Sequence, residues 1–186
     1  MLVLVLALIG GLGAGYATGG RLGNVVHVRF RSAWLAVAAL ALQIIAFSAI
    51  GSHLGSAWIA VLHIVSYVGL LVFAGINLRL PGVAPASVGV LCNALAIAAN
   101  GGYMPARRAA LAAAGVLYDG RIAANSRLIG GSTRFAFLGD VFALPKGVPL
   151  ADVFSVGDVL IVAGVVLLIA MAMHRDTGRR RIEGTT

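Results

Sequence analysis

Three aspartates lie within the stretch FLGDVFALPKGVPLADVFSVGDVLI, which runs from Phe137 to Ile161. The whole chain has only six acidic residues, so Asp140, Asp152 and Asp158 are half of them. Asp140 is flanked by apolar residues, and desolvation there would favour its neutral form. Two carboxylates that share one proton can accept a proton from water and donate one to a carbonyl oxygen, as in an aspartic peptidase. The stretch therefore predicts Asp140 and Asp158 as a catalytic dyad, and Asp152 as a solvated loop residue.

Asp158 also has a purely structural interpretation. Ser155 and Asp158 have the S-x-x-D spacing that is close to a capping box, in which each side chain accepts a hydrogen bond from the backbone amide of the other residue. Ser155 would then be the N-cap, and Asp158 would lie at the positive end of the helix dipole. The sequence leaves both interpretations open, because a carboxylate can cap a helix without any chemistry.

Asparagines are candidates for binding a substrate. Asn93 and Asn100 are seven residues apart, so they would share one face of a helix. They would point toward the same membrane edge as the carboxylates and, with Ser155, hydrogen-bond a substrate. Gln43 and His63 also lie in apolar segments, where polar side chains usually bond to a neighbouring helix.

The sequence predicts no metal site and no cofactor. His63 lacks a second histidine or a carboxylate at ligand spacing, and the histidines form no facing pair for haem. Cys92 is the single cysteine, so an intrachain disulfide is excluded. The segment GGLGAGYATGG lacks the spacing of a dinucleotide-binding loop. It instead places Gly11, Gly15 and Gly19 on a ridge suited to close helix packing.

The composition is that of a bilayer protein. Of the 186 residues, 60% are hydrophobic and 11% are charged, whereas a soluble domain is about half apolar and a quarter charged. We expect an all-α integral membrane protein with no nucleic-acid partner. The first apolar segment is predicted to be a retained helix rather than a signal peptide, because no Lys or Arg precedes Arg21. Five apolar segments approach the ~20 residues that cross a hydrocarbon core: Leu2–Thr18, Ala33–Ile50, Ala57–Leu78, Ala86–Asn100 and Phe154–His174.

Arginines orient the predicted bundle. Basic residues in short connections favour the cytoplasmic side, which predicts five transmembrane helices with the N-terminus outside and the C-terminus inside. Residues 1–174 would form the bundle and 175–186 a basic cytoplasmic tail. Residues 101–153 would form a long extracytoplasmic segment that acts as a lid, with a short interfacial helix within 106–120. The arginines assigned to the cytoplasm are Arg21, Arg29, Arg31, Arg79, Arg175, Arg179, Arg180 and Arg181.

Two motifs resemble those of lipoprotein signal peptidase (signal peptidase II), an aspartic peptidase of the bacterial inner membrane with four spans. LGDVFALP around Asp140 is similar to the first catalytic motif of that family, and FSVGD around Asp158 is similar to the second. The resemblance covers about Phe137–Ala170. It implies cleavage of a membrane peptide or lipoprotein at the outer face of the bacterial cytoplasmic membrane. The N-x-x-D-R motif of the family has only NSR as a counterpart, which makes Arg127 a further substrate-binding candidate.

A non-enzymatic membrane protein is the alternative. The chain would then be a partner-binding, assembly or immunity factor, or a small transporter subunit, and Asp158 would only cap its helix. The lipid bilayer is the expected partner in both cases.

Overall fold

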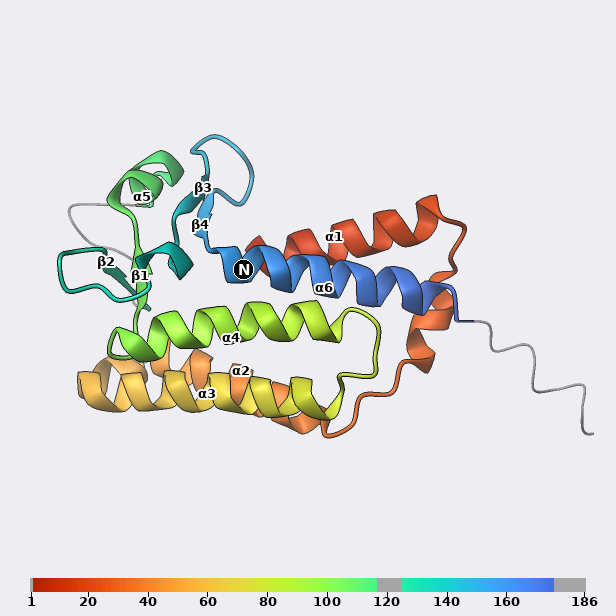
Figure 1. The fold of residues 1–186 in the computed structure, drawn as a ribbon, viewed down its shortest axis with the longest axis horizontal. Helices are drawn as coiled ribbons and strands as arrows, with labels where there is room; N and C mark the ends of the chain where they lie inside the picture. The colour runs from red at the N-terminus through yellow and green to blue at the C-terminus, as the bar shows by residue number, and fades with distance from the viewer. Residues whose placement is uncertain (1, 117–124, 176–186) are drawn as a thin grey trace, which may run out of the picture.

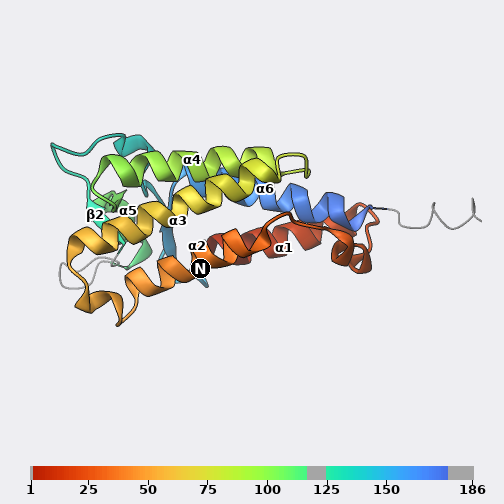
Figure 2. The same ribbon diagram turned by 90° about the horizontal axis from the view of Figure 1, so that it is seen from below.

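The structure, a computed structural model, describes residues 2–116 and 125–175. Among these residues, five helices of 15 residues or more run along the long axis of the molecule (Figure 1). Figure 2 shows the same helices side by side from below. Each overlaps one predicted apolar segment, so the predicted helix positions are confirmed. The helices are α1 (Leu2–Ala17), α2 (Ala33–Phe47), α3 (Ser56–Ile76), α4 (Val83–Ala99) and α6 (Val156–Met173).

Within the described chain, two of these helices, α3 and α6, are long and apolar enough to cross a membrane. The segment Val5–Ala17 of α1 and the whole of α2 and α4 are shorter apolar helices of 10–17 residues. Large apolar side chains such as Ile9, Val37 and Val68 are exposed on the helices. A helix that is apolar all round requires either burial or a lipid environment, and these helices have little protein covering their outer faces.

Glycines allow α6 to pack closely against α4. Gly89 on α4 faces Gly157 on α6, and a side chain at Gly89 would come within 2.8 Å of the Ile161 backbone nitrogen. Seven residues earlier, at the N-cap of α4, Gly82 makes a second contact of the same kind with Gly164, which lies seven residues further along α6. Small residues at such crossings let two backbones approach each other, which maximises van der Waals contact between apolar helices.

The predicted glycine ridge in α1 is confirmed at two of its three positions. Gly11 packs against Ile169 of α6, and Gly15 packs against Met173. The prediction is wrong for Gly19, which follows α1 and has a φ of +85°. No atom lies within 4 Å of the position that a Cβ atom would take at this residue. The ridge ends there because the helix ends at Ala17.

The segment before α6 contains short strands, so the expectation of an all-α fold is wrong here. β1 (Met104–Ala106) pairs in parallel with β2 (Ser126–Leu128), and β3 (Phe142–Leu144) pairs antiparallel with β4 (Asp152–Phe154). Each strand has three residues, too few to show a period of two in the sequence. The short helix predicted within 106–120 is confirmed as α5 (Arg108–Ala114), while residues 117–124 lie outside the described residues.

Described basic residues lie at both ends of the bundle, whereas the described carboxylates lie at the end with the sheets, beside Arg107, Arg108, Arg127, Arg134 and Lys146. α5 and both sheets lie at one end, where α4 ends and α6 begins (Figure 1). The connections from α1 to α2 and from α3 to α4, which carry Arg21, Arg29, Arg31 and Arg79, lie at the other end (Figure 1). Of the predicted basic tail, the described residues include only Arg175.

Candidate functional site

A cavity of about 310 Å³ lies where the short strands meet α3, α4 and α6. Asp140, Asp152 and Asp158 all line it, and they are the only acidic residues within 2–116 and 125–175. The cavity, called the aspartate cavity below, thus collects every described carboxylate of the chain. Its lining consists of His63, Tyr67, Asn93, Ile97, Met104, Asn125, Ser126, Asp140, Asp152, Val153 and Asp158.

The backbone of Asp140 is fixed to the edge of β1. The amide of Asp140 donates to the Pro105 carbonyl at 2.8 Å, and the Arg107 amide donates to the Asp140 carbonyl at 3.0 Å. Gly139 makes this approach possible, because a side chain at that position would collide with the Pro105 carbonyl. The strand therefore determines where Asp140 lies, independently of the apolar residues that follow it.

The Asp140 side chain is 8% exposed and faces the aspartate cavity. Within the described residues its carboxyl group forms no hydrogen bond or ion pair, and no buried polar atom is left enclosed without a partner, so its oxygens are accessible from the cavity. Burial raises the pKa of Asp140 to about 7, and the negative charges of Asp158 and then Asp152 contribute to the rise. Near neutral pH, Asp140 can therefore both donate and accept a proton.

Asp158 is held by a closed hydrogen-bond network. One carboxylate oxygen accepts from the Ser155 amide at 2.9 Å, and the other accepts from Asn93 Nδ2 at 2.9 Å. The Ser155 hydroxyl accepts from the Asp158 amide at 3.0 Å and donates to Asn93 Oδ1 at 2.8 Å. The predicted capping box is thus confirmed. Since each carboxylate oxygen has two acceptor sites, Asp158 keeps acceptor capacity toward the cavity.

The interpretation of Asp152 as a solvated loop residue is wrong. Asp152 begins β4 and is half-buried, because its pairing with Leu144 of β3 brings the carboxylate to the aspartate cavity. One of its oxygens accepts from the Val153 amide at 2.9 Å. A three-residue strand pairing between distant segments gives no local sequence signal, so the carboxylate could not be placed from the sequence.

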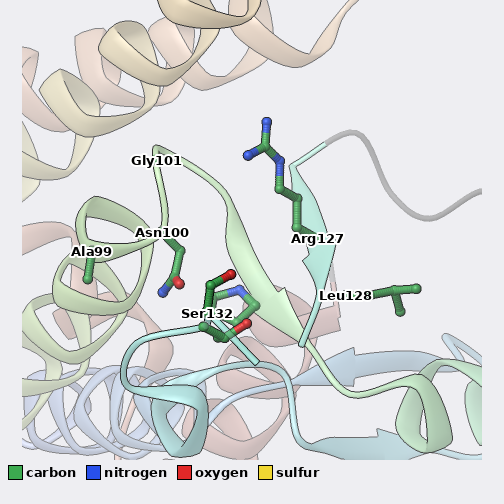
Figure 3. Close-up of a pocket in the computed structure, with 8 residues that line it drawn as sticks. Ala99, Asn100, Gly101, Arg127, Leu128 and Ser132 are labelled. Atoms are coloured by element: carbon green, nitrogen blue, oxygen red, sulfur yellow. The ribbon is translucent and has the colours of Figure 1, made fainter. Parts of the chain in front are cut away.

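The predicted substrate-binding residues are divided between two sites. Asn93 lines the aspartate cavity, and Ser155 is fully buried beneath it with its hydroxyl on Asn93. Asn100 and Arg127 instead line a second cavity of about 330 Å³ together with Ser132 (Figure 3). The expectation that Asn93 and Asn100 point to the same place is wrong, because Asn100 follows the last residue of α4.

In the second cavity, the two predicted residues have structural contacts of their own. The Asn100 side chain donates to the Arg134 carbonyl at 2.8 Å and accepts from the Arg134 amide at 3.0 Å. The Arg127 guanidinium lies over the Tyr103 ring, 3.8 Å from its centroid. Figure 3 shows Asn100 next to Ser132, with the Arg127 guanidinium extending away from both. These residues are not positioned to contact a group bound at the aspartates.

His63 and Tyr67 were not predicted as site residues, yet both line the aspartate cavity from α3. His63 Nδ1 donates to the Gly102 carbonyl at 2.7 Å, which joins α3 to the segment before β1. Their spacing of four residues, which places them on one helical face, was the signal in the sequence. Gln43 donates to the Ser66 hydroxyl at 3.0 Å, which confirms its predicted role between helices. Within the described residues, no group of His, Cys, Asp and Glu side chains is arranged to hold a metal ion.

The raised pKa of Asp140 predicts a pH-dependent stability. The unfolded chain titrates this carboxyl near 3.8 and the folded chain near 7, so between these values the folded state binds more protons. Its stability should fall as the pH rises from about 4 to 8, by up to roughly 4 kcal/mol from this group. Asp140→Asn lacks this titration, so it should gain stability relative to wild type over the same range. Chemical unfolding in detergent at several pH values measures the difference, and parallel curves for the two proteins would contradict the prediction.

Comparison with known proteins identifies a family for most of the chain. A family model described as "Family of unknown function (DUF5317)" matches residues 27–170, which include α2 to α4, both sheets and most of α6. No curated protein and no solved structure matches the chain.

Proposed function

The chain belongs to the DUF5317 family, a family of unknown function, and from the aspartate cavity we propose that it is a membrane-embedded aspartic peptidase. Its substrate is a peptide or lipopeptide, such as a lipoprotein precursor, cleaved at the outer membrane–water interface. The helices cross the bacterial cytoplasmic membrane five times, with the N-terminus outside and the C-terminus inside. The arginines at the end of the bundle opposite the cavity support this orientation.

The observation that carries the proposal is that Asp140 and Asp158 line the same cavity in different chemical environments. Asp140 is buried, has a pKa of about 7 and has no partner among the described residues, so it supplies the proton. Asp158 is oriented by Ser155 and Asn93. Two carboxyl groups whose environments differ in this way suit the acid and base roles of one reaction. The motif resemblance around the same two residues is a second support.

The reaction then proceeds by proton exchange across the dyad. Asp158 accepts a proton from water as the water oxygen bonds to the scissile carbonyl carbon, and Asp140 donates its proton to the carbonyl oxygen. The tetrahedral diol collapses when a diol proton returns to Asp140 and Asp158 gives its proton to the leaving nitrogen. The C–N bond breaks, and both carboxyl groups return to their starting states. The cavity volume of about 310 Å³ lies at the lower end of the range for binding sites.

Comparative proteomics of membranes tests the proposal. Cells that produce the wild-type chain should contain peptide N-termini that are absent when the Asp140→Asn/Asp158→Asn variant replaces it at equal abundance. The uncut precursors should accumulate in the variant. Identical sets of N-termini in the two membranes would refute peptidase activity.

The second candidate function is a non-enzymatic one, as a partner-binding, assembly or immunity factor or a transporter subunit. The observation that favours it is the capping network, in which both oxygens of Asp158 already accept hydrogen bonds within the chain. Under this function, the double variant would leave every N-terminus unchanged. It would instead alter which proteins are recovered with the chain after crosslinking in the membrane.

A further inference from the structure

The aspartate cavity carries an excess of negative charge. Three aspartates line it, of which Asp140 holds a proton in the acid role proposed above, and no Lys or Arg is among its lining residues. Within the described residues, none of the three carboxylates forms an ion pair with a basic side chain. Like charges that share a partly buried site repel each other, and the repulsion is stronger there than in water. The described chain therefore leaves this charge without compensation.

Two buried side chains direct unbonded polar atoms into the same space. Asp140 is 8% exposed and its carboxyl group has no partner among the described residues. His63 is 3% exposed, and its Nδ1 is used by the Gly102 carbonyl. Because no buried polar atom is enclosed without a partner, the remaining ring nitrogen of His63 is accessible from the cavity. Buried polar atoms normally have partners, so these groups are suited to contact a bound molecule.

One wall of the cavity is apolar. Ile97 and Met104 line it and belong to the buried cluster between α4 and β1. A site with an apolar wall and several carboxylates matches an alkyl chain that ends in a charged amine. The alkyl chain would lie on the apolar wall, and the ammonium group would lie on the carboxylates. A lysine side chain divides its contacts in the same way, with its methylene groups on apolar surface and its charge in polar surroundings.

We infer that the aspartate cavity recognises a protonated primary amine on an alkyl chain, as in a lysine side chain, and that Asp152 is the carboxylate that determines this specificity. In the proposed reaction Asp158 accepts a proton from water and Asp140 donates one, so Asp152 is the carboxylate of the cavity that remains for the amine. Asp152 uses one oxygen for the Val153 amide, and its other oxygen has no partner within the described residues. The assignment of Asp152 to substrate specificity rests on the proposed function, whereas amine binding itself does not.

Binding of n-hexylamine tests the inference on the purified full chain in detergent. The amine should raise the midpoint of thermal unfolding, while n-hexanol, its uncharged analogue, should not. Asp152→Asn should weaken the apparent affinity for n-hexylamine on the order of tenfold, since a charge-assisted hydrogen bond is lost. Ser87→Ala changes a polar side chain on α4 that does not line the cavity, and it should leave the affinity unchanged. Asp152→Glu keeps the charge and should retain most of the affinity.

Equal effects of n-hexylamine and n-hexanol on the wild type would overturn the inference, whatever the folding of the variants. Equal affinities of the wild type and Asp152→Asn would do the same. The measurement needs no cleavage, so the two proposals fail separately. A chain that binds the amine through Asp152 but cleaves no peptide would refute only the peptidase, and a chain that cleaves peptides without amine binding would refute only this inference.

Discussion

Replacing either Asp140 or Asp158 by asparagine is expected to slow peptide cleavage by the purified chain about 10³-fold or more. Each substitution removes one of the two groups that exchange protons with the substrate, and general acid–base catalysis of this kind contributes about 10²–10⁴-fold. The double variant should be little slower than each single variant, because groups that act as a unit are not additive. Cleavage rates measured on a precursor identified by membrane proteomics give the comparison.

The dependence of kcat/KM on pH adds a second readout to this experiment. Asp140 must be protonated to act as the acid and has a pKa of about 7, so wild-type activity should decline as the pH rises above 7. Ser87→Ala is the matched control: the Ser87 hydroxyl on α4 bonds only to the Val83 carbonyl in the described chain, away from the aspartate cavity. Variants of Asp140 or Asp158 that fold and cleave as fast as this control would exclude the dyad.

Gly157→Ala is expected to destabilise the chain by about 3 kcal/mol or more. The added methyl group would collide with Asn93 Oδ1 and with the Gly89 carbonyl, where α4 and α6 are closest. Overpacking costs about 1–3 kcal/mol, and displacement of Asn93 would also break its hydrogen bonds to Ser155 and Asp158, each worth roughly 1 kcal/mol. Unfolding in detergent measures the free energy, and the same variant should lose cleavage activity because Asp158 loses its orientation.

Gly13→Ala in α1 is the control for this substitution. It makes the same chemical change, but nothing lies within 4 Å of the added methyl group. Alanine is a better helix former than glycine by about 1 kcal/mol, so this variant should be as stable as the wild type or slightly more stable. A Gly157→Ala variant that matched Gly13→Ala would show that α4 and α6 are not in close contact at Asn93.

Local sequence patterns determined the positions of the helices and the start of α6. The apolar segments predicted all five long helices, since an apolar run of this length has few alternatives to a helix. The spacing of Ser155 and Asp158 predicted the capping box that begins α6, because both partners lie within one turn. The small residues Gly11 and Gly15 predicted one face of close packing, although they could not identify α6 as the partner.

The composition of the aspartate cavity depended on contacts between distant segments. Asp152 reaches it through a strand pairing with Leu144, and Asp140 through its backbone bonds to β1. His63 reaches it through the packing of α3 against α4, whereas Arg127 lies in another cavity.

The sequence by itself thus determined where the helices run, how α6 begins and how rare acidic residues are in the chain. Only the tertiary structure decided that all the described carboxylates share one cavity with His63 and Tyr67. The physical reason is the distance along the sequence between the residues that interact. Apolar runs and caps depend on neighbours within a turn or two, while the cavity is formed by side chains up to 95 residues apart, from His63 to Asp158, which only chain packing brings together.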